Sequence, residues 1–174
     1  MSDATAPPRH RVELSRAESL RLLGSVSLGR VVFTRRALPA IRPVNHVVDG
    51  GNVVIRTHEG AALAGLAAPP EQTGIGSRGR AAGRPGRGEG GDAGQGVVVA
   101  YEADAIDPET HLGWSVVVTG YCTLVTDPDE LARYEALLEP WWDERMDCAV
   151  RIRPSLVTGV RLTNGRGAAP TAAT

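Results

Sequence analysis

Few side chains in this sequence have the spacing that catalytic machinery requires. The four histidines form no HxxxH or HExxH motif, and no serine lies in a GxSxG motif. His58 and Glu59 with His111 suggest a metal site, but scattered surface histidines are the much commoner explanation of such a set. Cys122 and Cys148 lie far apart and belong to no CxxC pair, which argues against a zinc site or a disulfide framework. We therefore expect no metal and no hydrolase activity.

A glycine-rich segment offers a second candidate for chemistry. Residues 74–79 match GxGxxG by letter, but they follow no strand and open no apolar helix, so the context for holding a pyrophosphate is missing. Nearby arginines resemble the RGG segments of nucleic-acid binders, yet no aromatic residue lies between them to stack on bases. We interpret residues 68–96 as a flexible inserted loop rather than a nucleic-acid-binding segment. The arginines of this loop are Arg78, Arg80, Arg84 and Arg87.

The composition is that of one ordinary soluble domain. The chain has 174 residues, 42% of them hydrophobic, which is enough for a real core. All 19 basic residues are arginine and the net charge is -1, so the molecule has neither a lysine for a Schiff base nor the overall charge of a polyanion binder. The polar N-terminus lacks the apolar stretch of a signal peptide, and no segment approaches membrane-spanning length. We expect a cytoplasmic protein.

The first half of the chain predicts a helix and a three-stranded antiparallel meander. Ser15 and Glu18 form a capping box ahead of a short amphipathic helix that ends near Gly24. Strands are expected at residues 29–34, 41–48 and 53–57, with turns at residues 37–40 and 49–52.

The second half predicts the strands that complete a barrel. A short helix over residues 60–67 precedes the loop, and Asp127 with Pro128 begins a helix whose buried face comprises Leu131, Tyr134, Leu137 and Leu138. Strands are expected at 97–101, at 114–125 with a bulge at Gly120, at 148–153, and at 156–162 beyond Pro154. These elements predict a mostly β fold, an antiparallel barrel with short helices. The barrel domain spans residues 14–162, interrupted by the 68–96 loop, between flexible tails at 1–13 and 163–174.

Four segments of the sequence carry a family resemblance. They are Arg-Pro-Val-Asn-His-Val-Val at 42–48, Val-Val-Ile-Arg-Thr-His-Glu-Gly at 53–60, Gly-Trp-Ser-Val-Val-Val-Thr-Gly at 113–120, and the closing stretches 152–154 and 157–159. Together they resemble the pyridoxamine 5'-phosphate oxidase-like FMN-binding split-barrel family over most of residues 14–162. The resemblance implies an antiparallel Greek-key split barrel and a homodimer with FMN in a groove at the subunit interface.

The resemblance also implies which residues bind the cofactor. Residues 43–45 would line the isoalloxazine, Arg56 and Thr57 would hold the phosphate, and the 114–115 pair would lie near the flavin or the dimer contact. A guanidinium makes bidentate charge-assisted bonds to phosphate, and a neighbouring hydroxyl adds a donor. Two alternatives stay open, namely that Arg56 ends an edge strand in solvent and that the tryptophan only packs. The full set is Pro43, Val44, Asn45, Arg56, Thr57, Trp114 and Ser115.

The sequence departs from the family pattern at one place. Ala61 and Ala62 precede Leu63 where the family typically has Ser-Lys before a leucine. Loss of a charged phosphate contact lowers affinity roughly ten- to a hundredfold. We hypothesise that an arginine of the 68–96 loop takes the place of that lysine.

These observations favour a flavin-binding oxidoreductase that acts on an unidentified small molecule. FMN would be bound noncovalently and would carry the hydride or electron transfer, so no catalytic side chain is assigned. The deazaflavin F420 is the rival cofactor. The alternative class is a non-catalytic split-barrel binding protein with weakened flavin affinity, which the Ala61-Ala62 pair and the long loop favour.

Overall fold

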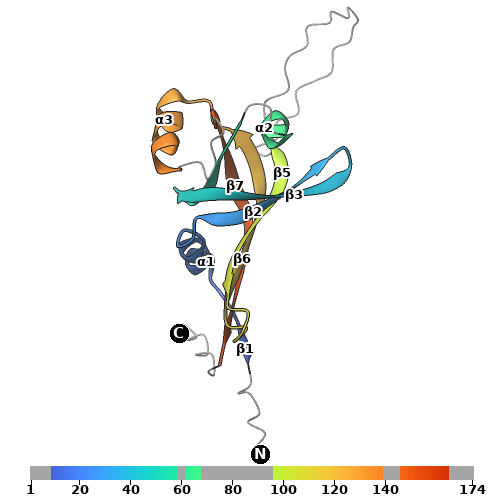
Figure 1. Ribbon diagram of the computed structural model, residues 1–174, viewed down its shortest axis with the longest axis vertical. Coiled ribbons are helices and arrows are strands. Elements are labelled where there is room, and N and C mark those ends of the chain that lie inside the picture. The colour runs from blue at the N-terminus through green and yellow to red at the C-terminus, as the bar shows by residue number, and fades with distance from the viewer. Residues whose placement is uncertain (1–8, 59–61, 68–95, 139–145, 165–174) are drawn as a thin grey trace, which may run out of the picture.

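Six antiparallel strands form a closed barrel, and a seventh pairs with one of them, in the computed structural model (Figure 1), which describes residues 9–58, 62–67, 96–138 and 146–164. The strand order is β1-β7-β4-β3-β2-β5-β6, and an additional β6–β7 pairing closes the sheet on itself. The strands are β1 His10–Glu13, β2 Leu28–Arg35, β3 Leu38–Asp49, β4 Asn52–Thr57, β5 Val97–Ile106, β6 Gly113–Leu124 and β7 Cys148–Thr163. The helices are α1 Arg16–Leu23, α2 Ala62–Ala67 and α3 Pro128–Leu137. The predicted antiparallel barrel with short helices is confirmed.

Strand β7 closes the barrel because it pairs with two neighbours at once. Its first residues pair with β4, and the whole strand runs beside β6. Sequence analysis split this stretch at Pro154, and that prediction was wrong because β7 continues through the proline. The register shift predicted at Gly120 is present, but the extra residue is Ser155 on β7. A side chain at Gly120 would place its Cβ 2.1 Å from the Arg153 carbonyl oxygen, so only glycine fits at the shift.

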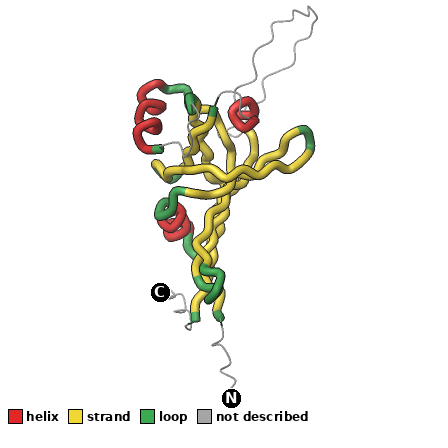
Figure 2. The backbone as a smooth tube through the Cα atoms, in the orientation of Figure 1, coloured by secondary structure: helices red, strands yellow, loops and turns green. Residues whose placement is uncertain are grey.

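The β2–β3–β4 meander forms as predicted, with one displaced turn. Gly50 and Gly51 turn the β3–β4 hairpin with φ of 55° and 78°. The β2–β3 turn lies at Arg36 and Ala37, whose φ values are 52° and 64°, whereas Pro39 is already part of β3. The turn predicted at 37–40 was therefore wrong by two residues. The β2–β3 hairpin projects beyond the barrel wall, as the tube in Figure 2 shows.

The helix starts predicted from capping residues are confirmed. The Ser15 side chain accepts a hydrogen bond from the Glu18 N–H at 3.2 Å, and Asp127 accepts one from the Glu130 N–H at 2.9 Å. Leu137 is exposed, however, so its assignment to the buried face of α3 was wrong. Residues 10–13, which we assigned to an N-terminal tail, instead form β1 and pair with residues 160–163 of β7.

Two apolar clusters hold the fold together, and β4 contributes to both. Val53 and Ile55 point into the barrel, where they pack with residues of every other long strand and with Leu23 of α1. Val54 points outward and packs beneath α3 with Tyr134. Strand β4 is therefore buried on both faces, and α3 is part of the core rather than a surface appendage.

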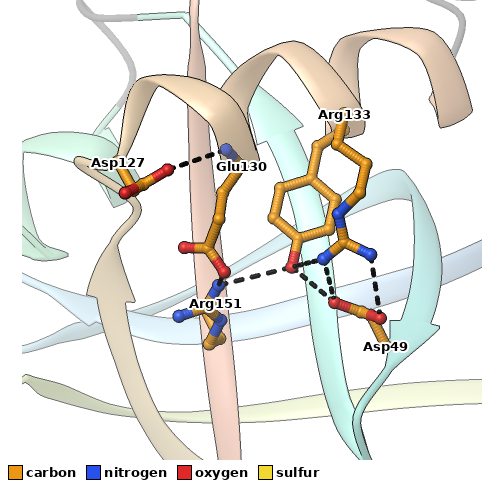
Figure 3. A network of polar contacts seen from close by, with 6 residues as sticks. Asp49, Asp127, Glu130, Arg133 and Arg151 are labelled. Atoms are coloured by element: carbon orange, nitrogen blue, oxygen red, sulfur yellow. Dashed lines mark hydrogen bonds and ion pairs between the residues drawn. The ribbon is translucent and has the colours of Figure 1, made fainter.

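A polar network fastens α3 to the barrel (Figure 3). The Tyr134 hydroxyl donates to the Asp49 carboxylate at 2.7 Å, and Arg133 donates to the other oxygen of that carboxylate at 3.2 Å. Arg151 of β7 donates to Glu130 at 2.6 Å and to the Tyr134 hydroxyl at 3.3 Å. The bonds from Arg133 and then Tyr134 lower the pKa of Asp49, so the carboxylate stays charged through the neutral range.

Replacing Tyr134 with phenylalanine tests this network. Because Tyr134 is fully buried and donates to a charged group, we expect Tyr134→Phe to lower the free energy of unfolding by about 1.5–3 kcal/mol. Tyr121→Phe is the matched control, since Tyr121 is half-buried on β6 and belongs to no such network. Urea unfolding measures both, and equal losses in the two variants would contradict the assignment.

Candidate functional site

A groove lies between three segments that the fold brings together. The connection from α1 to β2, the second half of β3 and the end of α3 enclose about 760 Å³. Figure 1 shows α1 and α3 on the same side of the barrel, and the groove lies between them. Its size is typical of small-molecule sites. The lining residues are 24–27, 45–48 and 136–138.

The groove lining is uncharged near neutral pH. Its polar side chains are Ser25, Ser27, Asn45 and His46, and the described lining includes no arginine, aspartate or glutamate. The Ser25 hydroxyl donates to the Leu22 carbonyl at 2.6 Å. Around these groups lie valine and leucine side chains. Such a lining suits a ring system that is largely apolar with a few polar atoms.

His46 is a buried, neutral histidine at the wall of this groove. Its Nε2 lies 2.9 Å from the Leu23 carbonyl oxygen, and its Nδ1 lies 2.7 Å from the Tyr101 hydroxyl. A carbonyl oxygen can only accept, so Nε2 carries the proton and Nδ1 accepts from Tyr101. Burial lowers the pKa of His46 and raises that of Tyr101. The ring is therefore neutral at physiological pH.

Sequence analysis missed this role because it treated the histidines as scattered surface residues. A signal was present in the alternation of β3. Val44 and Val48 pack against the barrel core, and His46 lies between them at the same face of the strand.

Asn45 and Arg56 share the outer face of the sheet. The β3–β4 register pairs His46 with Ile55, both directed inward, so the neighbouring Asn45 and Arg56 both point outward toward α3. Both side chains are 8% exposed. Asn45 lines the groove, as does Leu138, whose carbonyl oxygen accepts a bond of 3.0 Å from Arg56. The structure thus brings these two predicted residues to the same face of the sheet, and of the two only Asn45 lines the groove.

The Arg56 guanidinium donates hydrogen bonds to backbone carbonyl groups of the same chain. Besides Leu138, its guanidinium donates to the Met146 carbonyl and to the Glu135 carboxylate. It does not end an edge strand in solvent, which settles one alternative left open by the sequence. Arg56 is also absent from the groove lining, so its contacts act on the groove through Leu138.

The other predicted site residues lie away from the groove within one chain. Pro43 is exposed beside Arg30, Val44 packs against the core, and Thr57 pairs with Cys148 at the end of β4. Trp114 is buried in the barrel core near the β5–β6 turn, and Ser115 donates to Glu102 at 3.4 Å on the outer face. Within a single chain, the structure therefore supports the alternative in which Trp114 only packs in the core.

Some of the residues named in the sequence analysis lie outside the part of the chain that the structure describes, and the metal and membrane expectations are compared here with the described part alone. The loop arginines proposed to replace the family lysine lie outside the described residues, as does Ala61. Within the described ranges, no group of three His, Cys, Asp or Glu side chains is placed to hold a metal ion. In the same part of the chain, no helix has the length and apolarity to cross a membrane.

The barrel and its groove define a split-barrel protein, and comparison with known proteins identifies the family. The model described as pyridoxamine 5'-phosphate oxidase matches residues 15–75 and 77–161. The chain therefore belongs to the pyridoxamine 5'-phosphate oxidase family, as the sequence motifs implied.

Relatives of known sequence or structure agree with this membership. The uncharacterized protein Rv0080 of Mycobacterium tuberculosis is 50% identical over 154 residues, which cover 88% of this chain and 87% of that protein. A Corynebacterium glutamicum protein is 31% identical with a TM-score of 0.62, covering 90% of this chain and 96% of its own. The FAD binding protein from Mycobacterium smegmatis is also 31% identical, with a TM-score of 0.60 and coverage of 87% and 99%.

Replacing Arg56 tests its structural role. In Arg56→Met one buried and one partly buried carbonyl group lose their donor, so we expect the free energy of unfolding to fall by about 2–4 kcal/mol. Arg21→Met is the control, because Arg21 is exposed on α1 and, among the described residues, forms an ion pair with Glu18 alone at 3.8 Å, a type of contact that contributes little. Thermal and urea unfolding would contradict the role if the two variants were equally stable.

Proposed function

We propose that this protein is a flavin-binding oxidoreductase that binds FMN noncovalently and acts on a small molecule. The observation that carries the proposal is the groove of about 760 Å³ with the buried Asn45 amide in its wall. Family membership supports it, as does the 31% identity to a mycobacterial protein described as FAD binding.

The groove fits the ring portion of a flavin better than its phosphate. An asparagine amide both donates and accepts, which matches the mixed donors and acceptors at the polar edge of an isoalloxazine. No cation is part of the described lining, so the groove offers a phosphate no charge-assisted contact. The phosphate would then lie beyond the groove, and Thr57 at the end of β4 is the residue we assign to it.

The chain's own contribution is binding, orientation and exclusion of water. A bound flavin supplies hydride or electron transfer. The one ionisable side chain in the described lining is His46, whose two ring nitrogens are both engaged within the protein. We therefore assign no acid or base to the groove, and the apolar side chains around it keep water from the ring.

F420 and a non-catalytic role are the competing possibilities. An uncharged groove accepts the ring of F420 as well as that of FMN. The engagement of Arg56 by backbone carbonyls favours a protein with weakened flavin affinity, since the guanidinium expected at the phosphate is used elsewhere. Titration with FMN, FAD and F420, followed by a turnover assay with NAD(P)H, separates the three cases.

We also propose that the protein is a homodimer. One row of paired, outward-facing residues crosses five strands of the barrel. Its two end residues, Ile41 and Leu156, are aliphatic and are 56% and 58% exposed, and Val98 lies two positions before the row's residue on β5. The adjacent row holds Arg30, which lies 3.2 Å from both Glu102 and Asp104. An apolar band bordered by both signs of charge suits a second copy of the same surface. The members of the row are Ile41, Val32, Ala100, Thr119 and Leu156.

Flavin titration of an asparagine variant tests the assignment of the groove. We expect Asn45→Ala to weaken flavin binding by about five- to fiftyfold, since it removes one or two hydrogen bonds to the ring. Asn52→Ala at the β3–β4 turn is the matched control and should bind as wild type does. Quenching of flavin fluorescence measures all three proteins, and equal affinities for Asn45→Ala and wild type would exclude the groove as the ring site.

Charge introduced on the apolar band tests the dimer. We expect the double variant Ile41→Arg, Leu156→Arg to be a monomer of about 18.3 kDa by light scattering, while wild type has twice that mass. Leu66→Arg is the control, because Leu66 is 39% exposed but lies on α2, outside both the band and the groove lining. A wild-type monomer at micromolar concentration would contradict the proposal.

A further inference from the structure

Three arginines lie on a hairpin arm that leaves the barrel. The arm is the end of the β2–β3 hairpin, residues 33–42, where β2 and β3 pair only with each other among the described residues. It carries Arg35, Arg36 and Arg42, all exposed, and the stretch from residue 28 to residue 48 contains no aspartate or glutamate. Because the whole chain has a net charge of -1, the arm is a local concentration of positive charge.

The arginines of the arm have no acidic partner in the described part of the chain. Arg30, at the base of the hairpin, is paired with two carboxylates of β5, whereas Arg35, Arg36 and Arg42 form no such ion pair. The Arg42 guanidinium donates to the Ile41 carbonyl at 2.8 Å, so it is held against the arm itself. Arg35 and Arg36 are therefore the two that can meet an anion.

The turn at the tip holds an arginine where the backbone disfavours one. Arg36 and Ala37 have φ values of 52° and 64°, a region that glycine and asparagine adopt at lower cost. Within the described ranges, no hydrogen bond or ion pair of the Arg36 side chain offsets this cost. A charged side chain held in a strained turn is typical of a binding site.

The open edge of the arm is poorly suited to bind another strand. Strand β3 pairs with β4 only from His46 onward, and the His46 N–H is directed toward the β2 side. The backbone groups of residues 39, 41 and 43 therefore face the open edge. Pro39 and Pro43 have no N–H there, and the Ile41 carbonyl already accepts from Arg42. The arm thus offers a ligand its side chains rather than its backbone.

The tip of the arm is too far from the groove of its own chain to serve it. Figure 1 shows the β2–β3 tip on the side of the barrel opposite to α1 and α3, and the groove lies between these helices. Residues 45–48 of β3 line the groove, and at about 3.3 Å per residue the tip lies roughly 20 Å away along the same strand. An arginine side chain does not span that distance.

A second copy of the chain brings an arm and a groove together. The apolar band proposed as the dimer contact includes Ile41, which belongs to the arm. A two-fold axis perpendicular to the arm reverses its direction, so the tip of one copy is carried toward the side of its partner on which α1 and α3 lie. The same operation brings the partner's arm to the first groove.

The groove lacks the charge that the arm holds. Its described lining includes no arginine, and Thr57, the residue assigned to the phosphate, supplies a hydroxyl without charge. A guanidinium makes bidentate, charge-assisted contacts to phosphate. We propose that Arg35 and Arg36 of one copy bind the phosphate of a flavin nucleotide whose ring lies in the groove of the other copy. This inference rests on the proposed flavin site and on the proposed dimer.

Titration with FMN and with riboflavin tests the phosphate contact, because riboflavin has the same ring without the phosphate. We expect the double variant Arg35→Gln, Arg36→Gln to bind FMN about ten- to a hundredfold more weakly than wild type and to bind riboflavin equally well. The matched control Arg9→Gln, Arg11→Gln also removes two exposed arginines, at the start of β1 and outside the groove lining, and should bind both ligands as wild type does. Equal FMN affinities of the two double variants overturn the proposal.

Two glycine variants separate the charge of Arg36 from the shape of the turn. Both Arg36→Gly and Ala37→Gly relieve a positive φ, so each should be at least as stable to heat as wild type. We expect only Arg36→Gly to weaken FMN binding, by about tenfold. If both variants weaken it equally, the turn rather than the guanidinium is responsible, and the role of Arg36 is overturned.

Mixed dimers test whether the arm acts on the groove of the partner. Asn45→Ala removes a ring contact, and the double variant at residues 35 and 36 removes the phosphate contact; the two proteins are coexpressed in equal amounts. When one site combines two copies, about half of the dimers are mixed and each has one intact site, so about one quarter of all sites should bind FMN as wild type does. Neither variant alone has such sites. A mixture without them overturns the proposal.

Failure of this inference and failure of the proposed function give different results. If wild type binds neither FMN nor riboflavin, the proposed function fails and the phosphate site fails with it. If wild type binds both ligands and the double variant at residues 35 and 36 binds both equally well, the ring site stands and only the phosphate contact of the arm is overturned.

Discussion

Burial of β4 on both faces is the constraint on which the rest of the structure depends. Val53 and Ile55 fill the barrel, while Val54 and Arg56 lie beneath α3. A strand that is buried on both faces needs apolar cover on each, and the barrel interior and α3 supply it. Because α3 is held there by the Tyr134 network and by Arg56, its C-terminal end meets β3 and the α1–β2 connection, and the groove exists where these three segments meet.

The groove is defined as much by the charges it lacks as by the groups it contains. Arg56 is close to the groove in space but donates to backbone carbonyls, and Asp49, which is not part of the lining, is paired with Arg133. The remaining polar atoms belong to two serines, Asn45 and His46. Such an environment selects for shape and hydrogen bonding over charge.

Much of the fold could be read from the sequence where the deciding contacts are local. The caps at Ser15 and Asp127 depend on an N–H three residues ahead, and the Gly50-Gly51 turn depends on φ values that glycine adopts freely. The errors arose where a local signal competed with a distant one. Pro154 reads as a strand break, yet it is accommodated at the register shift beside Gly120, and Arg36 and Ala37 adopt positive φ because the pairing of Arg35 with Leu38 requires a two-residue turn.

By itself, the sequence determined the local elements, the barrel class and, through its motifs, the family. Tertiary structure alone decided what the candidate residues do. His46 meets Tyr101 across 55 positions of sequence, and Arg56 meets Leu138 across 82. Strand alternation says which residues share a face, but the identity of the neighbouring element follows from how the barrel closes. Whether a polar side chain becomes a ligand contact, a buried support or a surface group is therefore set by packing between distant segments.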